Sequence, residues 1–230
     1  NKGRRRHEYG NGLHGNSGLR VGNRSSIKLV IDLAMDLIIV AIFVIAFIFQ
    51  IFFPKTRFSS RKIGFLIFAA ILSAVFGFAI FVSYRQYLLW KNDEMGKLFL
   101  PPYQSFDYFI YYVRYRFFNS YLLSLIFGIG AFIAAKKMNK KYGGRFFEVI
   151  EPYLLMAGMS AQGTPGWILY LMVLLPMFLI INFFLSTFHF LSNKEMPRVS
   201  LYYFWLPAAI FTIIISRWLS VLPLWLTLKF

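Results

Sequence analysis

Long, uninterrupted runs of apolar residues dominate the chain, and polar residues gather in shorter stretches between them. The apolar runs fall at residues 27–53, 63–84, 108–135, 146–162, 167–190 and 201–219. A run of about 18 or more apolar residues is long enough to cross the hydrocarbon of a bilayer as a helix. The pattern therefore predicts an all-α, polytopic integral membrane protein with about six transmembrane helices.

Two segments interrupt this simple pattern. The run 146–162 is short for a full crossing and ends at the turn sequence Gly163-Thr164-Pro165-Gly166. We favour a crossing with little tilt, and a re-entrant hairpin covered by protein is the alternative. Residues 85–107 are too polar to span, and Trp90 with its neighbours Tyr84 and Tyr87 predicts an interfacial amphipathic segment.

Residues 1–26 are polar, rich in glycine and basic, and they show no apolar periodicity. Such a composition is typical of an extended tail that does not pack a core of its own. The sequence thus divides into a basic tail, residues 1–26, and a helical transmembrane domain, residues 27–230.

Composition agrees with a lipid environment, because 58% of the residues are hydrophobic and the mean hydropathy is +0.59. The charge balance is strongly positive, with 25 Lys and Arg against 9 Asp and Glu. In a soluble protein this excess would suggest nucleic acid as the partner. Here the cations lie between apolar runs, so we expect them to contact anionic lipid headgroups and to set topology, and we expect no nucleic acid.

Three basic loops, residues 54–62, 136–145 and 191–200, predict the orientation of the chain. Short loops rich in Lys and Arg stay on the cytoplasmic or matrix side, so a bacterial inner membrane or an organelle inner membrane is expected. Alternating crossings then put the basic tail on the opposite side, against the same rule. Either a segment upstream of Asn1 dictates this arrangement, which the absence of an initial Met allows, or one of the predicted spans does not cross.

Four cations around the third apolar run are candidates for holding a lipid phosphate or another acidic ligand. Arg114 and Arg116 lie at its beginning, and Lys136 and Lys137 lie at its end. Guanidinium and ammonium groups are the usual phosphate ligands. The structural alternative is that the arginines extend toward the headgroups from an aromatic belt.

Two acidic pairs are candidates for a polar or ion site. Asp32 and Asp36 are four residues apart and Glu148 and Glu151 are three apart, so each pair lies on one helical face. A pair of carboxylates at membrane depth can share a proton or hold a cation. The alternative is a structural role at headgroup depth, capping a first turn and forming surface ion pairs.

Catalytic and metal-binding signatures are missing from the sequence. Without cysteine there is no disulfide, thiolate metal site or cysteine nucleophile. The three histidines form no ligand cluster, and no zinc-protease, phosphate-loop, dinucleotide or serine-hydrolase motif is present. We therefore expect no cofactor, no metal and no catalytic residue.

Val113-Arg114-Tyr115, with the apolar run and the lysine-rich loop that follow, resembles the early part of prolipoprotein diacylglyceryl transferases. The histidine–glycine motif and the later arginine-bearing glycine motif of those enzymes are absent at the corresponding places. We do not infer membership of that family.

The favoured functional interpretation is a non-catalytic integral-membrane subunit or scaffold, with anionic lipids and other membrane subunits as partners. One alternative is a lipid-handling enzyme for phospholipid or acyl-group transfer, with Arg114 and Arg116 on the phosphate and Glu148 or Glu151 as base. The other is a transporter or channel for ions or small solutes, with the break at 163–166 in its path.

Overall fold

The computed structural model describes residues 17–52, 61–144, 147–192 and 202–219, and within these ranges the chain is helical without a strand. The elements are α1 (Ser17–Phe52), α3 (Arg61–Asn92), η1 (Gly96–Phe99), α4 (Phe106–Val113), η2 (Arg114–Phe118), α5 (Asn119–Lys141), α6 (Glu151–Gln162), α7 (Gly166–Ser192) and α8 (Trp205–Leu219). The predicted all-α class is confirmed.

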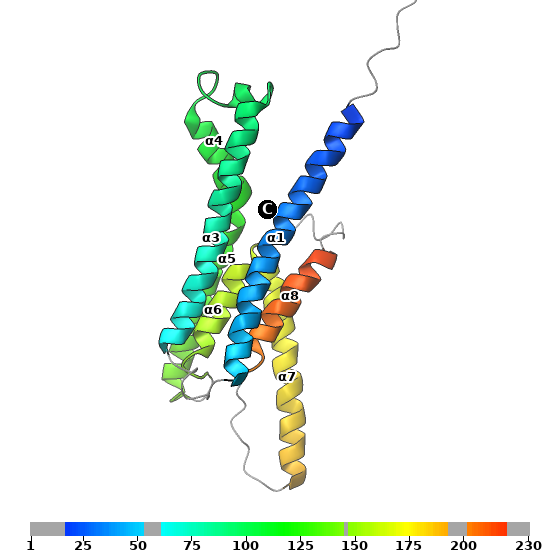
Figure 1. Ribbon diagram of the computed structural model, residues 1–230. Coiled ribbons are helices and arrows are strands. Elements are labelled where there is room, and N and C mark those ends of the chain that lie inside the picture. Colours follow the sequence, from blue (N-terminus) through cyan, green and yellow to red (C-terminus); the bar gives the residue numbers. More distant parts are fainter. Residues whose placement is uncertain (1–16, 53–60, 145–146, 193–201, 220–230) are drawn as a thin grey trace, which may run out of the picture.

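The helices form one elongated bundle in which neighbours along the chain run in opposite directions (Figure 1). In that view α1 descends, α3 ascends, and α4, η2 and α5 descend together as one continuous helix. The short helices α6 and α8 ascend, and α7 descends between them in sequence. The start of α3 and the end of α5 therefore meet at the lower end, which we call the basic end because Arg61, Lys62 and 136–141 lie there.

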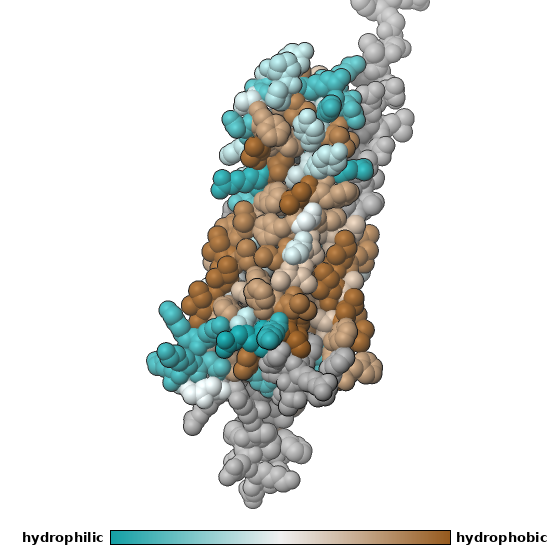
Figure 2. All heavy atoms as spheres, turned by 60° about the vertical axis from the view of Figure 1, so that its left-hand side comes forward, coloured by the Kyte–Doolittle hydropathy of each residue, from teal (hydrophilic) through white to brown (hydrophobic). Residues whose placement is uncertain are grey.

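Three stretches of helix are long and apolar enough to cross a membrane, namely Leu33–Phe52, Arg61–Asn92 and Phe106–Lys141. Their outward side chains are mostly apolar, and Figure 2 shows a hydrophobic belt between two hydrophilic ends. A belt of this kind matches hydrocarbon between two headgroup layers. These helices fit the predicted helical membrane protein, and the described residues do not confirm the predicted count of about six spans.

Helix α6 forms the centre of the bundle. Every side chain from Glu151 to Ala161 is buried, and the helix packs against α3, α5, α7 and α8. Glycines allow this close approach: a β-carbon built on Gly64 of α3 would lie 2.9 Å from the Tyr153 β-carbon, and one on Gly128 of α5 would lie 3.0 Å from Ser160 Oγ. Small residues at helix contacts have this role in membrane proteins.

The favoured crossing of residues 146–162 does not agree with the length of α6. The helix has 12 residues, about 18 Å at 1.5 Å per residue, whereas the hydrocarbon layer is about 30 Å thick. It begins only at Glu151 because Pro152, in its first turn, has no backbone N–H and a φ angle suited to a helix start. By itself α6 cannot reach from one headgroup layer to the other.

Two other predicted boundaries also move. Helix α1 begins at Ser17, inside the predicted tail, because a helix once nucleated extends through polar residues at little cost. Helix α3 continues to Asn92, so residues 85–92 prolong a span where a separate interfacial segment was expected. The Trp90 ring stabilises this extension, with its centroid 4.8 Å from that of Tyr112 and 5.4 Å from that of Phe109.

Candidate functional site

A pocket of about 350 Å³ opens at the basic end of the bundle, between the start of α3, the end of α5 and the segment that leads into α6. Its lining comprises Arg61, Lys136, Asn139, Lys140, Gly144, Glu148, Val149, Pro152 and Tyr153. The lining thus contains three cations and one carboxylate around a space of the size that small ligands use. Of the four predicted basic candidates, this pocket includes Lys136.

Several contacts fix the pocket walls. The Lys136 ammonium lies 4.3 Å from the ring centroid of Phe132 and 5.3 Å from that of Tyr153, so two aromatic faces hold it in place. Asn139 Nδ2 donates a hydrogen bond of 2.8 Å to the Phe147 carbonyl, and its Oδ1 accepts one of 3.2 Å from the Phe147 N–H. These two bonds tie the end of α5 to the start of the next segment.

The other three predicted cations lie elsewhere. Lys137 is exposed and does not line the pocket. Arg114 and Arg116 are exposed on η2, a π-helical segment, and they precede Lys136 by 20 residues or more along one continuous helix. At 1.5 Å per residue this separation is about 30 Å, the thickness of the hydrocarbon layer. The structure therefore does not bring the two arginines together with the two lysines.

Glu148 and Glu151 do lie together, at the entrance of α6. The Glu151 side chain is buried, and its Oε2 accepts a hydrogen bond of 2.8 Å from the Glu148 backbone N–H. This bond ties the carboxylate to the segment that leads into α6, and the helix dipole favours a negative charge at this end of the helix. Near this entrance, the pKa of the Tyr202 phenol is raised, mainly by burial and to a smaller extent by the charges of Tyr203 and Glu148. The phenol therefore stays protonated.

Since Arg114 and Arg116 lie about 30 Å from the α6 entrance, no single small substrate touches both these arginines and Glu148. A general base must lie within hydrogen-bond reach of the atom that it deprotonates. The structure thus offers no geometry for the arginine–glutamate combination of the lipid-enzyme alternative.

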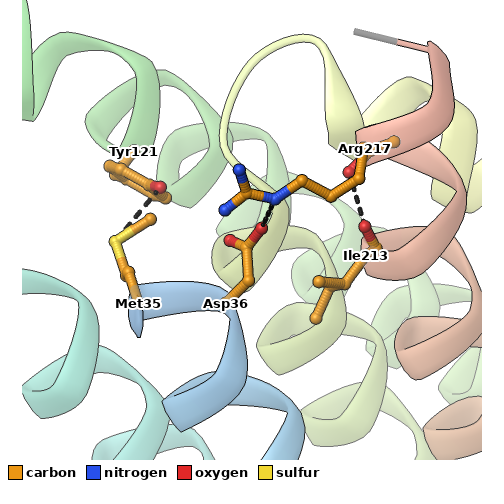
Figure 3. Close-up of polar contacts among 6 residues, drawn as sticks. Met35, Asp36, Tyr121, Ile213 and Arg217 are labelled. Atoms are coloured by element: carbon orange, nitrogen blue, oxygen red, sulfur yellow. Dashed lines mark hydrogen bonds and ion pairs between the residues drawn. The ribbon is translucent and has the colours of Figure 1, made fainter. Parts of the chain in front are cut away.

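The other predicted acidic pair, Asp32 and Asp36, lies on α1. Asp36 accepts a hydrogen bond from Arg217 Nε of α8 and forms an ion pair with it (Figure 3). Next to this pair, the Tyr121 hydroxyl of α5 lies 3.4 Å from the sulfur of Met35, which places Asp36 deeper in the belt than Arg116. The side chain of Asp32 lies outside the described part of the chain.

The break between α6 and α7 is a hydrogen-bonded turn against α5. Ser120 Oγ accepts a hydrogen bond of 2.7 Å from the Thr164 N–H, and Thr164 Oγ1 donates one of 3.0 Å to the Ser120 carbonyl. Gly163 has a φ of 64°, in the left-handed region that favours glycine. The polar backbone at this break is thereby satisfied by protein inside the belt, as membrane structures require.

No local spacing in the sequence indicates the partners of these residues. Arg61, Asn139 and Tyr153 join Lys136 in the pocket only because α3, α5 and α6 converge there. The cationic loops gave the one signal that could have been used, since they predicted a shared basic end. In the described residues, no three His, Asp or Glu side chains are grouped in a way that could hold a metal ion.

Comparison of the chain with known protein families, with curated proteins and with solved structures gave no match.

Proposed function

We propose that this protein is a non-catalytic subunit or scaffold of a larger membrane assembly, and that α7 provides a contact face for another membrane subunit. The observation that carries the proposal is the way α7 leaves the bundle (Figure 1). Its first turns are anchored by the buried side chains of Tyr170 and Leu174. Beyond them, Leu175, Leu179 and Phe183 are exposed and follow a helical spacing of four, so they form one apolar stripe.

Polar groups within the bundle support a structural role, because they join elements that are distant in sequence. Asp36 pairs with Arg217 between α1 and α8. Gln50 Nε2, near the end of α1, donates to the carbonyl of Tyr202 before α8. Such hydrogen bonds and ion pairs hold helices together where water is absent.

The proposal includes a topology in which α6 and α7 form a re-entrant hairpin that enters and leaves at the basic end. Its support is the shortness of α6 and the descent of α7 toward that same end (Figure 1). The basic end then faces the cytoplasm or the matrix, since it gathers Arg61, Lys62 and the cations of 136–141. Most of the loop 54–62 and most of the loop 191–200 lie outside the described residues.

Photo-crosslinking in native membranes tests the subunit role. A photoreactive residue at Leu179 is compared with one at Ile126 of α5, a matched apolar position whose side chain is 63% exposed against 64% for Leu179. We expect a protein adduct of defined mass from Leu179 and lipid adducts from Ile126, because α7 leaves the bundle whereas α5 stays within it (Figure 1). Lipid adducts alone at both positions would contradict the proposal.

Activity of the isolated chain would also contradict it. The chain, purified and reconstituted alone in vesicles, is expected neither to turn over a phospholipid nor to move a solute. Turnover or transport that a substitution at Glu148 or Glu151 abolishes, with the fold retained, would favour one of the alternatives instead.

A further inference from the structure

The pocket at the basic end has the charge and polarity of an anion-binding site. Arg61, Lys136 and Lys140 contribute three cations, Asn139 contributes an amide, and Glu148 contributes the one carboxylate of its lining. Cations from two helices that converge on one space can contact several oxygens of the same anion. A phosphate group fits this arrangement better than a carboxylate does, because it offers more acceptor oxygens.

The pocket is also built before any ligand arrives. Lys136 is held by the rings of Phe132 and Tyr153, and Asn139 is held by Phe147 through two hydrogen bonds. Gly64 allows α6 to lie against α3 one turn after Arg61, which fixes the width between those walls. Groups that are already ordered lose little conformational entropy when a ligand binds.

The pocket lies at the basic end, and Figure 2 shows a hydrophobic belt between two hydrophilic ends of the molecule. The exposed apolar side chains of Val149, at the pocket, and Ile133, one turn of α5 before Lys136 and Lys137, continue the belt up to this level. An anion that carries acyl chains can therefore place its phosphate among the cations and its chains along the belt. Basic pockets between transmembrane helices on the cytoplasmic or matrix side bind anionic headgroups in this way.

We propose that this pocket binds the phosphate headgroup of an anionic phospholipid. The assignment goes beyond the scaffold role and does not depend on it, since a subunit, an enzyme or a transporter could each hold such a lipid.

Lipid retention by the purified full-length chain tests the assignment, because the sequence offers a closely matched control. The pocket variant replaces the three lining cations: Arg61→Gln, Lys136→Gln and Lys140→Gln. The control variant replaces the cation that follows each of them on the same helix: Lys62→Gln, Lys137→Gln and Lys141→Gln. Both variants lose the same charge at the same membrane level, but the control positions are absent from the pocket lining.

Each protein in detergent is mixed with equal amounts of phosphatidylglycerol and phosphatidylcholine, and the lipid retained after gel filtration is quantified. We expect the unsubstituted chain and the control variant to prefer phosphatidylglycerol to a similar degree, and the pocket variant to lose about tenfold of that preference. An equal loss in both variants would mean diffuse surface attraction, and no loss in either would mean no site. Both results overturn the proposal.

Inorganic phosphate at the same concentration as the lipid separates a lipid ligand from a soluble one. If the lipid is the ligand, retention of phosphatidylglycerol is unchanged, because its acyl chains add contacts along the belt; displacement by inorganic phosphate at equal concentration would overturn the lipid assignment. Thermal unfolding checks that each variant is folded. If the pocket variant does not fold, the single substitutions Lys140→Gln and Lys141→Gln provide the same comparison, and equal retention by the two overturns the proposal.

Discussion

Gly158 and Gly130 show how differently two residues of the same type contribute to this bundle. A β-carbon built on Gly158 of α6 would lie 2.5 Å from the Tyr170 ring, whereas one on Gly130 of α5 would meet nothing within 4 Å. Tyr170 cannot move away easily, because it is fully buried and its hydroxyl donates to the Trp205 carbonyl at 3.2 Å. The glycine at 158 is therefore required by packing, and the one at 130 is not.

We expect Gly158→Ala to lower the free energy of unfolding by about 1–3 kcal/mol, because an added methyl group overpacks a rigid contact. Gly130→Ala is the matched control and should leave stability unchanged or raise it, since alanine favours the helix. Apparent melting temperatures in detergent measure both. Equal melting temperatures for the two variants would show that the contact between α6 and α7 is not as tight as described.

At the residue scale the sequence identified the charged side chains but not their partners. Asp36 was predicted, with Asp32, as a candidate for a polar or ion site, and the structure pairs it with Arg217. The two residues are 181 positions apart in the chain, so no local spacing could join them. Lys136 differs, because it was a predicted candidate and does line a pocket.

At the scale of helices, the ion pair of Asp36 and Arg217 joins α1 to α8, the first and the last described helices (Figure 3). The two side chains are only partly buried by protein, and the pair lies at the depth of the belt, where little water screens the attraction between them. The ion pair holds α8 against α1 and so against the rest of the bundle.

We expect Asp36→Ala to lower the free energy of unfolding by about 1–3 kcal/mol, because Arg217 then loses a charged partner within the belt. The double variant Asp36→Leu with Arg217→Met should recover most of this loss, since apolar side chains suit the same surroundings. Thermal unfolding of the single and double variants in one detergent makes the comparison. A double variant no more stable than the single one would contradict a role that depends on the pair.

The boundaries of α6 show what an apolar pattern can and cannot predict. Residues 146–162 look the same whether lipid or protein surrounds them, since hydropathy measures only the exclusion of water. The structure surrounds α6 with four other helices, and that contact depends on glycines in α3 and α5 that local sequence does not single out. Pro152 and the turn at 163–166 marked the two ends, although the apolar run between them was taken as a span.

For the whole molecule, the sequence predicted the class correctly because lipid demands long apolar runs and satisfied backbone groups. It did not predict how the helices divide between crossing the belt and filling its centre, which depends on tertiary contacts. It also gave no sign of the π-helical η2 segment that carries Arg114 and Arg116, since a change of hydrogen-bond register leaves no apolar pattern.

The membrane assignment requires hydrocarbon, and not water, around the belt. A chain without cysteine allows a direct test, because single cysteines can be introduced one at a time. Ile126→Cys lies in the belt and Met95→Cys lies beyond its upper edge, and both positions are exposed, at 63% and 71%. Thiols react as thiolates, which form in water but not in hydrocarbon.

Labelling of opened membranes with a water-soluble maleimide, without detergent, is the measurement. We expect rapid labelling of Met95→Cys and almost none of Ile126→Cys, with both thiols labelled after denaturation in detergent. Equal labelling of the two thiols in the intact membrane would contradict the membrane assignment.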